Sequence, residues 1–222
     1  PDVDAEIIIL GTRLWQNLGL IDTRLEINSL GAPANRARYL EDLRIFLEGC
    51  RDELDESSRR RLTKNPLRIL DSKDSGTQAI LDEGPDLASY LDDTDRRHFD
   101  CLLEHLERTG IEYHMNSRLV RGLDYYTGAV YEWTSIGLGA HNAFCGGGRY
   151  DGLVQQLGGA AVPAAGFACG MERLVELYRQ QPLATDMMGA EVWMVMLGDT
   201  AEAIGYPLAE NLREAGIQVV CN

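Results

Sequence analysis

The sequence of 222 residues lacks long apolar runs, C-x-x-C pairs and an initiator Met. No stretch approaches the roughly eighteen apolar residues of a membrane span, and the charged start is unlike a secretion signal. The five cysteines are odd in number and widely spaced, which argues against a disulfide framework or a zinc knuckle. These absences favour a cytoplasmic protein with reduced thiols and no membrane contact. Without a Met, residue 1 is not expected to be the natural start.

Positive charge is also scarce, because 21 basic residues face 35 acidic ones and the formal net charge is −14. Lys and Arg dominate binding to nucleic-acid phosphates, so no DNA partner is expected. One stretch, 57–68, is basic and has no acid. Any RNA contact is predicted there, although a solvated helix face would look the same. Its basic residues are Arg59, Arg60, Arg61, Lys64 and Arg68.

The content that is present, 45% hydrophobic and 25% charged residues, is typical of a globular protein. Apolar residues at three- or four-residue spacing predict a helix over 1–18. Its expected buried face consists of Val3, Ile7, Leu10, Leu14 and Leu18. Early acids suit the positive end of a helix, so Asp2, Asp4 and Glu6 are interpreted as capping charges rather than metal ligands. A strand is predicted over 23–28.

The pattern from about residue 35 to 110 is almost wholly helical. Helices are predicted over 36–54 and 95–110, with a break at Asn65-Pro66. In the second helix His98, Cys101 and His105 fall on one side, and all three residue types bind zinc. A structural zinc site wants a fourth ligand that no nearby Cys or His supplies. Packing is therefore favoured, and no metal is expected.

Strands are predicted beyond Gly110, over 111–115, 119–126, 128–134 and 140–147, which indicates an antiparallel sheet. A short helix over 149–157, a strand over 164–169 and a helix beginning at Gly170-Met171 follow. After a linker, the pattern reads strand, helix, strand to the end, with Gly216 closing the helix. The fold class is therefore α+β.

The most informative stretch runs from Arg121 to Gly152. A guanidinium presents a fixed positive fork to a carboxylate or phosphate. Two tyrosines, Tyr125 and Tyr126, add flat apolar walls with hydroxyl tips, and the glycines at 146–148 allow close approach. Each feature alone is usually core filler or a turn. Their combination predicts a site for a small polar molecule.

The boxes RGLDYYTG, YEW, CGGGRYDGLVQQLGG and GFACGMERL together resemble those of histidyl-tRNA synthetases, which are class II aminoacyl-tRNA synthetases. The resemblance runs collinearly through the chain. It implies a catalytic core over 1–32 and 113–181, a helical insertion domain over 33–112, and a linker with the start of an α/β anticodon-binding domain over 182–222.

The resemblance implies an enzyme that activates histidine with ATP and magnesium and transfers it to tRNA(His). In it, Arg121 binds the histidine carboxylate and the α-phosphate as the catalytic clamp, and Arg173 binds the adenosine end. The family acts as a cytoplasmic homodimer. The expected histidine pocket consists of Arg121, Tyr125, Tyr126, Gly146, Gly147, Gly148 and Tyr150.

Two signature motifs of the family, which carry the dimer interface and an ATP-gripping Arg, lie before the segment PDVDAE with which this sequence begins. The isolated chain is therefore expected not to form the adenylate. A non-catalytic alternative is the synthetase-like, histidine-sensing regulatory subunit of ATP phosphoribosyltransferase, which should not bind tRNA. A third is an RNA-binding module that acts through residues 57–68.

Overall fold

The structure is a computed structural model that describes residues 1–20, 22–122, 124–139, 142–181 and 190–221. The chain divides into two units, Pro1–Tyr178 and Arg179–Asn222. In the described part no helix is long and apolar enough to cross a bilayer.

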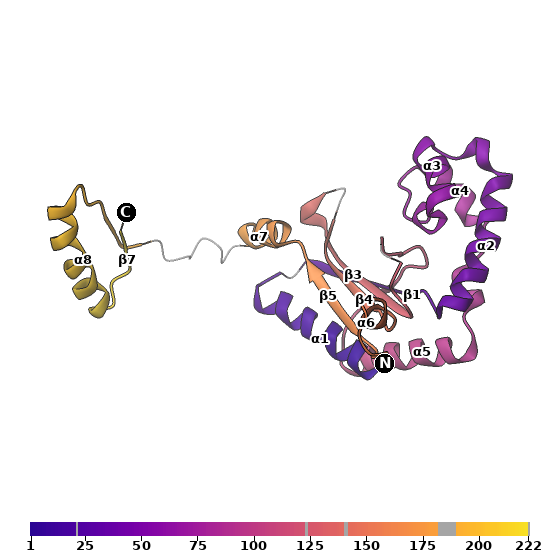
Figure 1. Ribbon diagram of the computed structural model, residues 1–222, viewed down its shortest axis with the longest axis horizontal. Helices are drawn as coiled ribbons and strands as arrows, with labels where there is room; N and C mark the ends of the chain where they lie inside the picture. The colour runs from indigo at the N-terminus through magenta and orange to yellow at the C-terminus, as the bar shows by residue number, and fades with distance from the viewer. Residues whose placement is uncertain (21, 123, 140–141, 182–189, 222) are drawn as a thin grey trace. The chain divides into compact units, whose positions relative to one another are not determined.

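A five-stranded sheet forms the centre of the first unit, in the order β2-β1-β3-β4-β5. Figure 1 labels β1, β3, β4 and β5 of this sheet. Every neighbouring pair is antiparallel except β1 and β2, which run parallel. In the register of β3 and β4, Glu132 stands opposite Gly146. The strands are β1 (Thr23–Ser29), β2 (His114–Met115), β3 (Ala129–Ser135), β4 (Ala143–Arg149) and β5 (Ala165–Cys169).

One face of the sheet packs against α1 (Asp2–Asn17), which in turn contacts α5 (Asp93–Arg108). The predicted helix at the N-terminus is confirmed, but its predicted buried face is wrong in part. Ile7 and Leu18 pack against the core, whereas Leu10 is 55% exposed and Ile8 and Trp15 are fully buried instead. Gly11 explains the difference. A Cβ there would lie 2.7 Å from the Trp133 ring, so the absence of a side chain lets that indole reach the helix.

The opposite face shares a second core with the helical segment. The predicted helix over 36–54 is shorter, because α2 ends at Gly49 and a separate 3-10 turn follows. The predicted break at Asn65-Pro66 is confirmed, and Tyr39, Leu43 and Leu47 of α2 are buried. The elements are α2 (Pro33–Gly49), η1 (Arg51–Glu53), α3 (Glu56–Lys64), η2 (Pro66–Ile69), α4 (Ser75–Asp82) and η3 (Leu87–Tyr90).

The prediction of a strand over 119–126 is wrong, because the described residues of this segment form no strand. It begins with a turn, since Leu119 N donates to Asn116 O at 2.9 Å. Its backbone is then held by arginine side chains instead of a neighbouring strand: Arg68 donates to Gly122 O at 3.1 Å and Arg36 to Asp124 O at 3.1 Å. The strand-like sequence pattern therefore belongs to a loop whose backbone is held by side-chain hydrogen bonds.

The hairpin from β4 to β5 also departs from the prediction. Arg149 remains in β4, and the short helix α6 covers only Leu153–Gln156. Beyond β5, α7 (Met171–Arg179) begins as expected. The predicted strand over 140–147 begins at Ala143, while residues 140 and 141 lie outside the described ranges.

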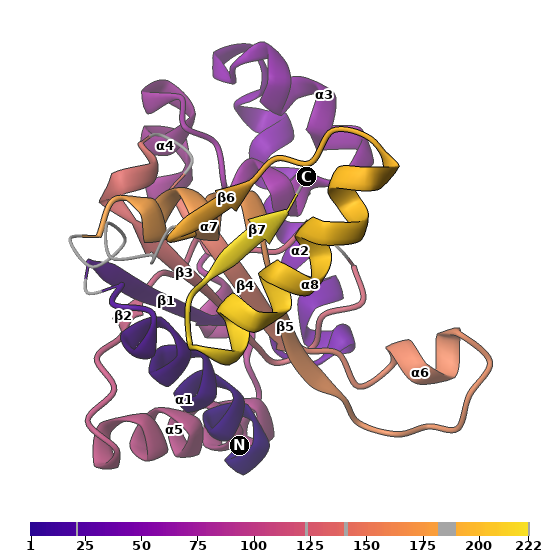
Figure 2. The same ribbon diagram turned by 90° about the vertical axis from the view of Figure 1, so that its left-hand side faces the viewer.

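The second unit contains the expected β-α-β arrangement (Figure 2). Strands β6 (Val192–Met194) and β7 (Val219–Cys221) pair in parallel, and α8 (Asp199–Glu214) connects them. Gly216 has φ +85°, which allows the chain to turn after the helix. The predicted domain boundaries at 32, 112 and 181 stay predictions.

Candidate active site

Arg121 lies across the sheet with its guanidinium against Gly146. A Cβ on that glycine would lie 2.5 Å from Arg121 Nη1. The same nitrogen donates to Glu132 Oε2 at 2.5 Å, and the side chains of this pair are 26% and 20% exposed. Arg121 Nε is buried and has no hydrogen-bond partner among the described residues. The cation is therefore fixed by β3 and β4 rather than turned to solvent.

The tyrosines form a cluster beside this cation. The ring centroids of Tyr125 and Tyr126 are 4.7 Å apart, and Tyr150 approaches them edge-on at 5.7 and 6.0 Å. Burial and a hydrogen bond with Tyr125 raise the pKa of Tyr126, while Arg121 opposes the rise. The Tyr126 hydroxyl therefore stays protonated near neutral pH and remains available as a donor.

The three glycines do not share one environment. Side chains alternate across a strand, so positions 146 and 148 face one side of the sheet and 147 the other. A Cβ at Gly148 would lie 2.9 Å from the Tyr126 ring, whereas one at Gly147 would lie 2.2 Å from Gly166 O. The structure thus brings Gly146 and Gly148 to the predicted Arg and Tyr, and places Gly147 against β5.

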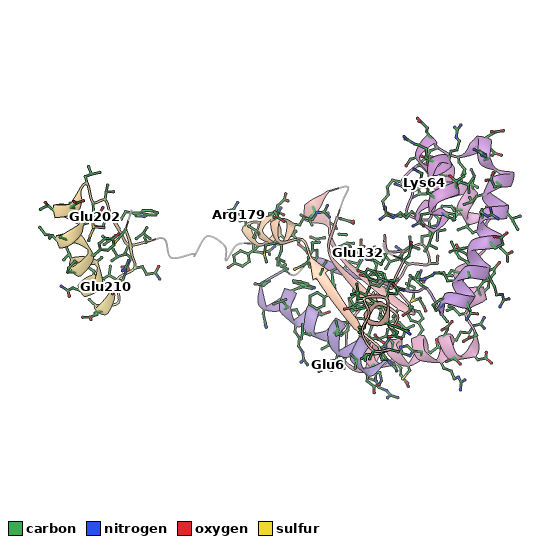
Figure 3. The ribbon with its side chains drawn as sticks, viewed as in Figure 1. Glu6, Lys64, Glu132, Arg179, Glu202 and Glu210 are labelled. Carbon is green, nitrogen blue, oxygen red and sulfur yellow. The ribbon has the colours of Figure 1, made fainter. Side chains whose placement is uncertain are left out.

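Glu132 was missed by the sequence-based site prediction, although a lone carboxylate in the apolar strand GAVYEWT is a usable signal. Burial raises the pKa of Glu132, and Arg121 opposes the rise. Glu132 also lines a polar pocket of about 260 Å³ between the sheet and the helical segment, together with Glu26, Asp71 and Asn116. Figure 3 shows Glu132 on the sheet.

Arg173 lies in the first turn of α7, and its guanidinium donates to the carbonyl of Ala143 at the start of β4. It is exposed. Arg173 therefore contacts β4, the strand whose Gly146 and Gly148 lie against the side chains of Arg121 and Tyr126.

The predicted RNA-contact residues lie on α3 and the following turn. Arg61 Nη1 donates to Arg68 O at 3.1 Å, and Arg68 reaches Gly122, next to Arg121. Arg59 is occupied with Leu54 O at 2.8 Å. The other two are exposed: Arg60 forms a long pair with Glu56 at 3.8 Å, and Lys64 is labelled in Figure 3.

The two α5 histidines bond to acids of α1. His98 Nε2 lies 2.8 Å from Asp4 Oδ2, and His105 Nε2 lies 3.1 Å from Asp2 Oδ1. Asp4 is 1% exposed and also receives two nitrogens of Arg149, at 3.0 to 3.1 Å. The interpretation of Asp4 as a capping charge is therefore incomplete, because it joins α1, α5 and β4.

Within the described ranges, no three His, Cys, Asp or Glu side chains come together as a possible metal-binding group. The Glu26, Asp71 and Glu132 carboxylates of the polar pocket are hard oxygen donors of the type that magnesium prefers, but they do not converge. The described residues thus do not fit a magnesium site, and we assign them no ligand role.

Comparisons with known proteins identify the family of the chain. The family model described as Histidyl-tRNA synthetase matches residues 1–174. A histidine–tRNA ligase of Bordetella pertussis is 49% identical over 220 residues, covering 99% of this chain and 51% of that protein. The chain therefore spans about half the length of the curated relatives it matches.

Two solved structures were also similar. The apo histidyl-tRNA synthetase of S. aureus superposes with a TM-score of 0.69 at 30% identity, covering all of this chain and 55% of that one. A Bacillus halodurans C structure described as an ATP phosphoribosyltransferase regulatory subunit/histidyl-tRNA synthetase gives a TM-score of 0.59 at 22% identity, over 99% and 59% of the two chains. That second likeness shows the fold alone. The predicted α+β class is confirmed as the class II synthetase fold, and the chain belongs to the histidyl-tRNA synthetase family.

Proposed function

We propose that this chain supplies the amino-acid clamp of a histidine–tRNA ligase, which activates histidine with ATP to histidyl-adenylate and then transfers it to tRNA(His). The observation that carries the proposal is Arg121, held over Gly146 by Glu132 and placed beside Tyr126. A partly buried cation whose Nε has no partner among the described residues suits a carboxylate, which can accept from two guanidinium nitrogens.

Each group has a distinct part in this proposal. Arg121 holds the histidine carboxylate and stabilises the charge that develops on the α-phosphate during in-line displacement. Tyr126, protonated at neutral pH, donates to the imidazole, and Tyr125 and Tyr150 enclose the ring. Gly146 and Gly148 form the floor, and Arg173 binds the adenosine end. Magnesium arrives with ATP as part of the substrate.

The sharpest test is binding of L-histidine to the 222-residue chain by isothermal titration calorimetry. Arg121→Ala should reduce affinity by about 100-fold, since a charge-assisted bidentate pair contributes about 1.5–3 kcal/mol. Arg44→Ala is the matched control, because Arg44 is exposed on α2 and pairs with its neighbour Glu41 at 3.0 Å. Equal affinity in both variants would contradict the proposed clamp.

The chemical step is tested in a hybrid enzyme. The segment of the B. pertussis ligase that aligns with this chain is replaced by the 222 residues, and histidine-dependent ATP–pyrophosphate exchange is measured. The hybrid should exchange, and its Arg121→Ala form should lose at least about 100-fold in kcat/KM. Exchange unaffected by that substitution would refute the catalytic assignment.

We further propose that Arg60, Arg61, Lys64 and Arg68 contact tRNA(His), and that the whole enzyme is a cytoplasmic homodimer. The support for the RNA contact is the position of Arg61 and Arg68 beside Gly122, next to the clamp. Replacing Arg60 and Lys64 by Ala in the hybrid should weaken tRNA binding. The slope of log affinity against log salt concentration should also become less steep, by the amount expected for about two phosphate contacts. An unchanged salt slope would reduce this stretch to a solvated helix. A histidine-sensing regulator would show no tRNA binding at all.

A further inference from the structure

Two cysteines stand opposite each other on neighbouring strands of the sheet. In the antiparallel register of β4 and β5, Cys145 pairs with Cys169. Residues that are directly opposite project to the same face. Both side chains accordingly pack in the core cluster on the α1 side of the sheet. The two thiols therefore face each other across the ladder.

The hydrogen bonds on either side define which kind of pair this is. Gly170 N donates to Phe144 O at 2.8 Å, and Tyr150 N donates to Ala164 O at 2.7 Å. These positions form hydrogen-bonded pairs, and such pairs alternate along an antiparallel ladder. Cys145 and Cys169 therefore form a non-hydrogen-bonded pair, in which Cα atoms lie about 4.5 Å apart and side chains approach most closely. A disulfide needs a Cα separation of about 4.4–6.8 Å.

The two thiols differ in accessibility. Cys145 is 4% exposed, and burial, then the neighbouring Cys169, raise its pKa to about 12. Cys169 is only partly buried, near the end of β5. An oxidant from solvent therefore reacts with Cys169 first, and Cys145 is the neighbouring thiol that resolves the oxidised product.

We propose that Cys145 and Cys169 form a peroxide-sensitive dithiol that closes into a reversible cross-strand disulfide. The sulfur of Cys169, as thiolate, attacks one oxygen of hydrogen peroxide and releases hydroxide, which gives a sulfenic acid. The sulfur of Cys145 then displaces the hydroxyl group from that sulfur, and water leaves as the S–S bond forms. Overall, two thiols lose two electrons and two protons, and one peroxide becomes two waters.

Closure would tie the start of β4 to the end of β5, which leads through Gly170 into α7 and Arg173. The disulfide would constrain the unfolded chain, so the oxidised protein should melt at a higher temperature than the reduced one. Because Cys145 must lose its proton to attack, closure should also accelerate as pH rises.

The test treats the reduced 222-residue chain with hydrogen peroxide and follows its intact mass. We expect loss of the mass of two hydrogens, reversed by dithiothreitol. Trypsin cuts at Arg121, Arg149 and Arg173, so the two cysteines fall in separate peptides, 122–149 and 150–173. Without reduction these two peptides should appear joined.

Three variants make the outcome decisive. In Cys169→Ser, the peptide containing Cys145 should keep the mass of its reduced form, and peroxide should not raise the melting temperature. Cys145→Ser should accumulate sulfenic or sulfinic acid on Cys169. Cys101→Ser, on α5, should close like the natural sequence. Oxidation of Cys169 to sulfinic acid while Cys145 stays reduced, or joining of Cys169 to another cysteine, would overturn the proposal.

Discussion

The ion pair with Glu132 replaces part of the water that the partly buried Arg121 side chain loses. Glu132 accepts from Nη1 at 2.5 Å. The missing side chain at Gly146 provides the space. Glycine is therefore required at position 146 by the Arg121 guanidinium that packs on it, and not by the backbone conformation.

Gly146→Ala should weaken histidine binding while leaving the fold intact. The new methyl group would meet the far end of the Arg121 side chain, which can shift without displacing the backbone. We expect about a tenfold or greater loss of affinity in calorimetry. The free energy of unfolding in a urea titration should change by less than about 1 kcal/mol.

Gly147→Ala is the matched comparison on the opposite face. Its methyl group would lie 2.2 Å from Gly166 O and 2.8 Å from Phe167 Cα, and backbone cannot move aside as a side chain can. The free energy of unfolding should fall by about 2 kcal/mol or more in the same urea titration. The assignment of the two faces would be wrong if alanine at 146 were the more destabilising of the pair.

At the scale of elements, three segments distant in sequence meet at one buried carboxylate. Asp4 of α1 binds Arg149 at the end of β4 and His98 of α5. Removing Asp4 takes the hydrogen bonds of Nε and Nη2 from Arg149, which keeps its pair with Asp151 at 2.9 Å, and leaves buried donors unpaired.

Asp4→Ala should therefore destabilise the chain by about 3 kcal/mol, measured by urea denaturation at pH 7. Asp2→Ala is the control, because the Asp2 side chain is 86% exposed and its pair with His105 should contribute less than about 1 kcal/mol. Similar losses for both would mean that Asp4 acts only as a charge near the start of α1.

Asp55 has a comparable role within the helical segment. Burial alone would raise its pKa, but hydrogen bonds from Ser58, Thr77 and Ser72 lower the pKa of Asp55 to about 2. Its side chain caps α3 through the backbone N–H groups of Ser57 and Ser58, at 2.8 and 3.0 Å. The carboxylate thus joins α3 to the start of α4.

This carboxylate predicts a definite pH dependence. A folded pKa below the unfolded one contributes stability above about pH 4, and that contribution is lost as pH falls toward about 2. Asp55→Ala should cost about 2 kcal/mol at pH 7 and much less at pH 2, in urea titrations of the two proteins. A cost independent of pH would show that the hydrogen bonds do not depend on the charged form.

The sequence predicted the elements better than their orientation. Periodicity located α1, but two patterns of similar spacing coexist in it, and only the position of Trp133 beneath Gly11 decides that Ile8 and Trp15 face the core. For the site, the boxes located Arg121 and Tyr126. Glu132 needed the strand register, and the clamping of the loop by Arg36 and Arg68 needed tertiary contacts that no local pattern contains.

At the scale of the whole molecule, the two units differ in how much apolar surface they bury. The first has two cores on the two faces of a five-stranded sheet. In its described residues the second has two short parallel strands and one helix, and Trp193 and Leu197 are 73% and 83% exposed. Parallel strands normally need cover on both faces, and two strands are marginal on their own.

Hydrogen–deuterium exchange of the intact 222-residue chain should therefore separate the units. Amides of β3 and β4, bonded on both sides within the sheet, should exchange only on global unfolding, whereas those of β6, α8 and β7 should open at a free energy lower by several kcal/mol. Urea should accordingly melt the second unit first, at a concentration below that at which the fluorescence of the buried Trp15 and Trp133 reports unfolding of the first. Equal protection of both units in the single chain would mean that the second is stabilised by more than the contacts within β6, α8 and β7.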